Sequence, residues 1–179
     1  MKRLRNLSIL FGIYLLVAVP FKVMEIIPGF TDVRPVTMLG PVYAVFAGIP
    51  GCAVMAVGNL VMDLVSNSLR WSSIMGFVAN FLGPFFIYLC WTRWSSKPFS
   101  LREGKNILRH TIVLFLSAVL EMALITPAVA LVYPEVDARL FAISVVLNTT
   151  LFPVIFGIPL MILLQEELGF KPIQKENRR

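Results

Sequence analysis

The 179-residue sequence is 58% hydrophobic and only 15% charged, with a mean hydropathy of +0.81. Soluble domains carry about 25% charged residues, so this composition excludes an ordinary soluble domain and predicts an all-α integral membrane protein. The net charge of +6 does not indicate nucleic-acid binding, because the basic residues lie between apolar runs rather than in one patch.

Six apolar segments follow one another in a single transmembrane domain that spans residues 1–179. A bilayer core of about 30 Å needs about 20 apolar residues in a helix, because the backbone must satisfy its own hydrogen bonds there. The basic start of the chain is typical of a signal peptide, but no clean cleavage site follows, so we expect a retained first helix. The expected helices are approximately 7–27, 36–49, 51–66, 72–91, 107–132 and 138–164, with a polar cytoplasmic tail at 165–179.

The second and third segments are too short to cross a bilayer comfortably. They are separated at Pro50-Gly51 and are rich in alanine and glycine, which let helices approach closely in lipid. We therefore expect these two segments to form a tight hairpin within a bundle of about six transmembrane helices.

Basic residues set the orientation, because cytoplasmic loops carry the excess of lysine and arginine. With the N-terminus inside and an even number of spans, twelve of the sixteen basic residues lie on the cytoplasmic side. The other four lie outside: Lys22, Arg34, Arg70 and Arg139. The sequence thus predicts that both termini are cytoplasmic.

Polar side chains within the apolar segments are the candidate site. Ionisable groups in the membrane are costly, so Asp63 and Glu121 are expected to face a protein interior or a wet cavity. Asn59 and Asp63 are four residues apart and share a helix face. A small-molecule pocket that opens outward and is closed by the loop carrying Arg34 is predicted from these substrate-binding candidates: Arg34, Asn59, Asp63, Asn80, Glu121 and Asn148. The alternative is that these groups only bond to one another between helices.

Enzymatic activity, metals and cofactors are not expected. Cys52 and Cys90 lie in apolar segments without CxxC spacing, and His110 is the only histidine. The sequence contains no HExxH, GxSxG or P-loop motif, so the chain is not expected to hydrolyse ATP itself.

The segment from Arg34 to Trp91 resembles the substrate-binding S components of energy-coupling factor (ECF) transporters. The resemblance covers about a third of the chain and rests on Arg34-Pro35, Gly58-Asn59-Leu60 with Asp63-Leu64, Gly76-Phe77, and Asn80-Phe81-Leu82. It implies a protein of a bacterial or archaeal cell membrane that captures a vitamin or related micronutrient from outside. It further implies uptake driven by a separate transmembrane T component and two ATPase subunits, with the first external loop as a lid.

The resemblance also implies a docking surface for the T component on the first helix. Related proteins often carry Ala-x-x-x-Ala there, and this sequence has Ser8 and Gly12 at the same four-residue spacing. Two alternatives to substrate capture remain: a structural or scaffold membrane protein of similar fold, and a proton-coupled secondary transporter. The two acidic groups favour a cationic or hydrogen-bond-donating substrate, and Arg34 favours an anionic end, so an amphoteric molecule would satisfy both.

Overall fold

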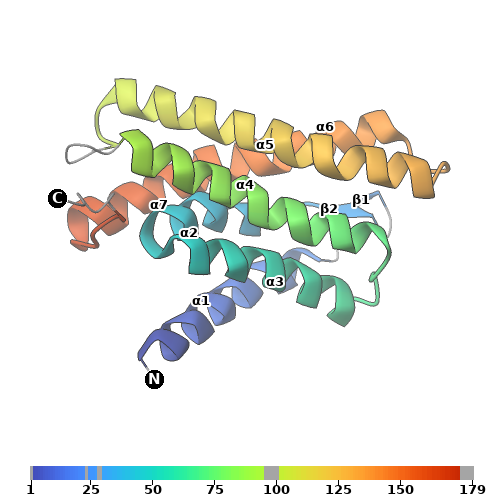
Figure 1. Cartoon of the computed structure of the whole chain (residues 1–179), viewed down its shortest axis with the longest axis horizontal. Helices are drawn as coiled ribbons and strands as arrows, with labels where there is room; N and C mark the ends of the chain where they lie inside the picture. Colours follow the sequence, from blue (N-terminus) through green and yellow to red (C-terminus); the bar gives the residue numbers. More distant parts are fainter. Residues whose placement is uncertain (1, 23, 28–29, 95–100, 174–179) are drawn as a thin grey trace.

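The computed structural model describes residues 2–22, 24–27, 30–94 and 101–173, and most of these residues are α-helical (Figure 1). One two-stranded antiparallel sheet, formed by β1 (Glu25–Ile27) and β2 (Thr31–Asp32), lies between the first two helices in the sequence. The helices are α1 (Lys2–Ala18), α2 (Leu39–Ala47), α3 (Ile49–Val65), α4 (Ser72–Trp94), α5 (Gly104–Val132), α6 (Ala138–Phe152) and α7 (Ile158–Ile162).

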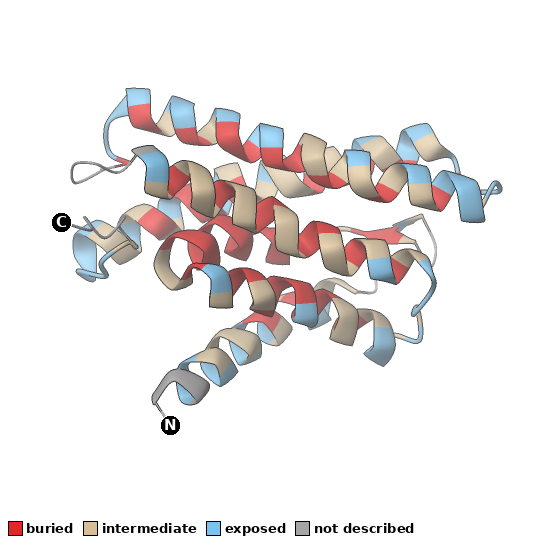
Figure 2. Cartoon of the chain, in the orientation of Figure 1, coloured by how far each residue is buried: buried red, intermediate tan, exposed pale blue. Residues whose placement is uncertain are grey.

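Among the described residues, three helices are long and apolar enough to cross a membrane: Ser72–Arg93, Gly104–Val132 and Ala138–Glu167. The last of these is continuous because π-helical turns at Pro153–Gly157 and Leu163–Glu167 join and extend α6 and α7. Large apolar side chains such as Leu16, Trp71 and Leu131 are exposed on the outside of the bundle, where Figure 2 shows the outward helix faces in pale blue. An all-α fold with an apolar outer surface fits the membrane class that the composition predicts.

The first helix is shorter than predicted. We expected a helix over 7–27, but α1 ends at Ala18, a 3-10 turn follows at Val19–Phe21, and Glu25–Ile27 is a strand. Pro20 lacks the N–H that would continue the α-helical hydrogen bonds, so the helix ends in its vicinity. The apolar residues beyond it gave the false impression of a longer helix, because a short apolar run does not distinguish helix from strand.

The break between the second and third helical segments lies at Gly48 rather than at Pro50-Gly51. Gly48 has φ 64° and ψ −144°, a conformation that side-chain-bearing residues rarely adopt. Pro50 instead lies in the first turn of α3, where its missing N–H costs little. The corner is covered by the C-terminal segment, since the backbone N–H of Ile173 donates to the carbonyl oxygen of Val45 at 2.8 Å.

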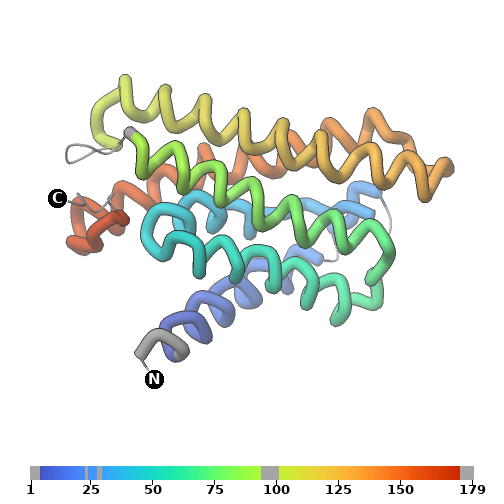
Figure 3. The backbone as a smooth tube through the Cα atoms, in the orientation of Figure 1, coloured from blue at the N-terminus to red at the C-terminus, as the bar shows by residue number. Residues whose placement is uncertain are grey.

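The order of packing brings the polar faces of four helices together. Helix α4 packs against α3 and α5, and α5 packs against α6. The sheet, the α3–α4 turn and the α5–α6 turn lie at one end of the bundle, and the start of α1 lies at the other end (Figure 1). In Figure 3 the light-blue segment after β2 runs back along the bundle towards the cyan helix α2. This segment therefore enters the bundle from the same end as the sheet.

Close packing of α1 on α3 depends on Gly58. A Cβ atom at this position would lie 2.6 Å from ring atoms of Tyr14, which is fully buried. A Gly58→Ala variant is therefore expected to be destabilised by about 1–3 kcal/mol, measured as a lower thermal unfolding midpoint in detergent. Gly12→Ala on α1 is the control, because nothing lies within 4 Å of a Cβ there. Equal midpoints for the two variants would contradict this account of the α1–α3 contact.

Candidate functional site

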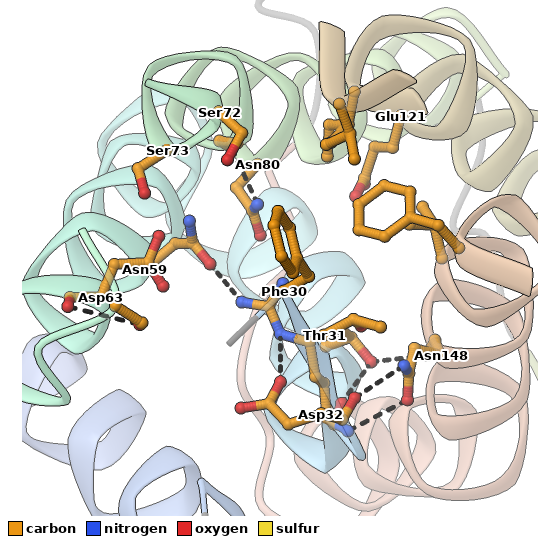
Figure 4. A pocket seen from close by; sticks show the side chains of 18 of the residues that line it. Phe30, Thr31, Asp32, Asn59, Asp63, Ser72, Ser73, Asn80, Glu121 and Asn148 are labelled. Atoms are coloured by element: carbon orange, nitrogen blue, oxygen red, sulfur yellow. Dashed lines mark hydrogen bonds and ion pairs between the residues drawn. The ribbon is translucent and has the colours of Figure 1, made fainter. Parts of the chain in front are cut away.

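A polar cavity of about 110 Å³ lies among the sheet, the segment after it and helices α3 to α6 (Figure 4). Helix α3 contributes Asn59 and Asp63, four residues apart as its period requires, and α4, α5 and α6 contribute further polar groups, among them Asn80, Glu121 and Asn148. The lining includes all six residues predicted as substrate-binding: Arg34, Asn59, Asp63, Asn80, Glu121 and Asn148. Five of these six come from helical positions, and Arg34 comes from the chain just after β2.

The two residues predicted for partner docking lie elsewhere. Ser8 and Gly12 are exposed on α1 and do not line this cavity. They share one side of the helix with exposed apolar residues such as Leu16. That side faces away from the bundle.

The positive charges of Lys22 and Arg34 at the cavity are balanced by two carboxylates, Asp32 and Asp63. The Nζ atom of Lys22 lies 3.4 Å from Asp32 Oδ2 and 3.5 Å from Asp63 Oδ1. The Nε atom of Arg34 lies 3.5 Å from Asp32 Oδ1. Asp32 thus joins both cations, and Lys22 ties the hairpin region to helix α3.

Neither Lys22 nor Asp32 was among the predicted site residues, although both line the cavity. The contacts that place them in the site join residues up to 41 positions apart, which no local pattern reveals. One local signal did exist for Asp32: it precedes Arg34 by two residues, and alternate residues of an extended chain share a face. Asp63 makes its ion pair with Lys22 and not with Arg34.

Arg34 is held on both sides of its guanidinium. In addition to the Asp32 contact, an Nη atom donates a hydrogen bond to Asn59 Oδ1. Burial opposes the charge on Arg34, but the nearby carboxylates, Asp32 foremost, keep the pKa of Arg34 above its ordinary value. The side chain therefore stays charged and links the segment after β2 to α3.

Asn148 connects the same segment to α6. Its Oδ1 atom accepts a hydrogen bond from the backbone N–H of Arg34 at 3.0 Å, and its Nδ2 group donates to the carbonyl oxygen of Asp32 at 3.0 Å. The hydroxyl of Thr37 donates to the backbone carbonyl of Asn148 at 2.7 Å. The predicted site residue Asn148 is thus occupied in holding the backbone that carries Arg34.

The other side of the cavity is mainly apolar. Ile125 and Val129 on α5 and Phe141 and Val145 on α6 form this wall. Glu121 interrupts it one turn before Ile125; its side chain points into the cavity in Figure 4, and the residue is only 6% exposed. No described residue donates a hydrogen bond to its carboxyl group. The cavity therefore combines a polar side, an apolar wall and one buried acid.

Aromatic contacts lie beside the cavity near the α3–α4 and α5–α6 turns. The ring of Phe30 packs edge-on against Tyr133 with centroids 5.0 Å apart, and the guanidinium of Arg70 lies 4.4 Å from the Phe30 centroid. These residues come from the hairpin, the end of α5 and the α3–α4 turn. A cation above an aromatic face is attracted to it, so this contact joins three connections around the cavity.

No family model, no curated protein and no solved structure matches the chain. The fold and the site define a helical protein with an apolar outer surface. Its described residues form a polar cavity, and the charged and amide side chains that line this cavity come from five segments of the chain.

Proposed function

We propose that this chain is a multi-pass membrane protein that captures a small molecule from the outer side of the membrane for uptake. The observation that carries the proposal is the polar cavity, because charged groups inside an apolar bundle are costly and most often serve a substrate or ion. Simple hydrogen bonding between helices would fill such space with the partners themselves, whereas here a cavity of about 110 Å³ lies between them.

Six membrane crossings are part of the proposal. The three long helices cross the bilayer, and the shorter apolar helices Arg5–Phe21, Pro35–Ala47 and Ile49–Val65 cross with them, the last two as a hairpin bent at Gly48. Both termini are then cytoplasmic, and Arg70 and Arg139 lie outside with the sheet. This orientation puts the cavity towards the outer side, where the β1–β2 hairpin acts as a lid.

The S-component resemblance adds the transport mechanism. Its motif residues Arg34, Asn59, Asp63 and Asn80 surround one cavity, which is the arrangement that a substrate-binding role requires. The captured molecule is a vitamin or related micronutrient, and a T component with two ATPases drives its release inward. Docking to the T component uses the exposed side of α1 that carries Ser8 and Gly12.

Uptake measurements test this proposal. Cells that express the chain together with a T component and two ATPases are expected to accumulate a micronutrient, and the Asp63→Asn/Glu121→Gln double variant is expected to abolish the accumulation. Uptake that persists without the ATPases but collapses with the proton gradient would support a secondary transporter instead. No uptake of any compound, with a double variant that retains full cellular function, would support the scaffold role.

A further inference from the structure

One carboxyl group at the cavity makes no hydrogen bond or ion pair with a described residue. Lys22 and Arg34 are paired with Asp32 and Asp63, and Glu25 is exposed at the rim. Glu121 is more than nine-tenths buried and accepts no hydrogen bond from any described residue, although it lines the cavity. Burying a carboxyl group without a hydrogen-bond donor costs free energy, so we expect a bound molecule to supply the donor.

A second acceptor lies on the neighbouring helix. The Nδ2 group of Asn80 donates to the carbonyl oxygen of Gly76 at 2.8 Å, which fixes the orientation of the amide. Its Oδ1 atom faces the cavity and receives no hydrogen bond from the described residues. Asn80 and Glu121 are on packed helices and point into the same space in Figure 4. This end of the cavity therefore has two hydrogen-bond acceptors, the Glu121 carboxyl group and Asn80 Oδ1, and suits a ligand with two donors.

The local packing keeps the Glu121 carboxyl group in this position. A Cβ atom on Gly83 of α4 would overlap the Glu121 side chain, so the glycine leaves the space that the acid occupies. Ile125, one turn further along α5, continues as apolar wall. The acid thus lies in a shaped recess at the edge of an apolar surface.

The two basic side chains of the site, Lys22 and Arg34, do not need an anionic ligand to balance their charge. Arg34 contacts Asp32 and Asn59, and Lys22 contacts two carboxylates, so both charges are already compensated. This compensation removes the reason to expect an amphoteric substrate. Among the described carboxyl groups that line the cavity, Glu121 is left without an ion pair or a hydrogen bond, although Arg34 is close enough to act on it electrostatically.

We propose that the cavity binds an organic cation whose N–H groups donate hydrogen bonds to the Glu121 carboxylate and to Asn80 Oδ1. A protonated amine, an amidine or a protonated aminoheterocycle has this chemistry. The carbon skeleton of the ligand packs on the apolar wall of Ile125, Val129 and Phe141. This inference rests on the proposed function and specifies the substrate class of the same site.

The test compares three matched sets of vitamins, vitamin precursors and small metabolites of similar size: organic cations with N–H donors, carboxylates, and neutral compounds. Binding to the purified full-length protein is measured by thermal shift and then by isothermal titration. The compounds that bind are expected to be cations. Glu121→Gln is expected to lower the affinity for them by about 10- to 100-fold, as for a lost charge-assisted hydrogen bond. Glu135→Gln, an exposed acid outside the cavity, is the control and is expected to leave affinity unchanged.

Two further variants separate the inference from effects on folding. Gly83→Ala keeps the carboxyl group but displaces the Glu121 side chain, and Asn80→Leu removes the second acceptor together with the amide donor to Gly76. Both variants are expected to bind the same cations more weakly. Folding of each variant is checked by its unfolding midpoint and gel-filtration profile. Binding of carboxylates only, or cation binding that Glu121→Gln leaves unchanged, would overturn the inference while the capture function stands. Failure of all three sets to bind would overturn both.

Discussion

An Arg34→Ala variant is expected to lose about 3 kcal/mol of stability, because it leaves a buried acid and a buried amide without their shared partner. Asp32 is 8% exposed and Asn59 only 3%, so water does not replace the lost guanidinium freely. The link between the segment after β2 and helix α3 is lost at the same time. The measurement is the thermal unfolding midpoint in detergent, together with the affinity for whichever compound the protein binds.

Arg139→Ala is the matched control, since Arg139 is an exposed arginine at the same end of the bundle. It is expected to leave both the midpoint and the affinity unchanged. Arg34→Lys is expected to recover only part of the loss, because a lysine does not reach a carboxylate and an amide with a planar fork. If Arg34→Ala and Arg139→Ala had the same midpoint, the role assigned to Arg34 would be wrong.

An Asn148→Leu variant is expected to release the β1–β2 hairpin and the segment after it from α6. Leucine is of similar size but forms no hydrogen bond, so the N–H of Arg34 and the carbonyl oxygen of Asp32 both lose their partner. Each unsatisfied group costs about 1–3 kcal/mol. Hydrogen–deuterium exchange at residues 30–38 is expected to accelerate by at least about tenfold, while exchange in α5 stays unchanged.

Two companion variants make this second prediction specific. Asn148→Asp retains the acceptor for Arg34 but loses the donor to Asp32, so its exchange rate is expected to be intermediate. Thr150→Val lies on the same helix and removes a buried hydroxyl that has no hydrogen-bond partner among the described residues, so it is expected to be neutral. Equal exchange rates in Asn148→Leu and Thr150→Val would show that Asn148 does not hold the hairpin.

The all-α class and six of the residues that line the cavity could be predicted from the sequence because both depend on local rules. A polar residue in an apolar segment has to avoid lipid, so Glu121 and Asn148 were expected to face inward before any contact was known. The four-residue spacing of Asn59 and Asp63 placed them on one face for the same reason.

The remaining features depend on tertiary contacts or on small local preferences. The ion pair of Lys22 with Asp63 joins the end of the first helical segment to α3 across 41 residues, so spacing could not reveal it. The end of α1 near Pro20 was missed because apolar residues continue beyond it, and the break at Gly48 was assigned to the adjacent Pro-Gly pair. At these two helix ends a competing signal was stronger in the sequence than the one that determines the structure.

The most direct test of the central claim is mass spectrometry of small molecules released from the purified protein. The wild type and Glu135→Gln are expected to carry the same small molecule, and the Asp63→Asn/Glu121→Gln double variant is expected to carry none. All three proteins have to elute as folded, monodisperse samples before the comparison is made. A wild-type protein that carries no small molecule, or one that the double variant carries equally, would contradict the claim that this cavity captures a ligand.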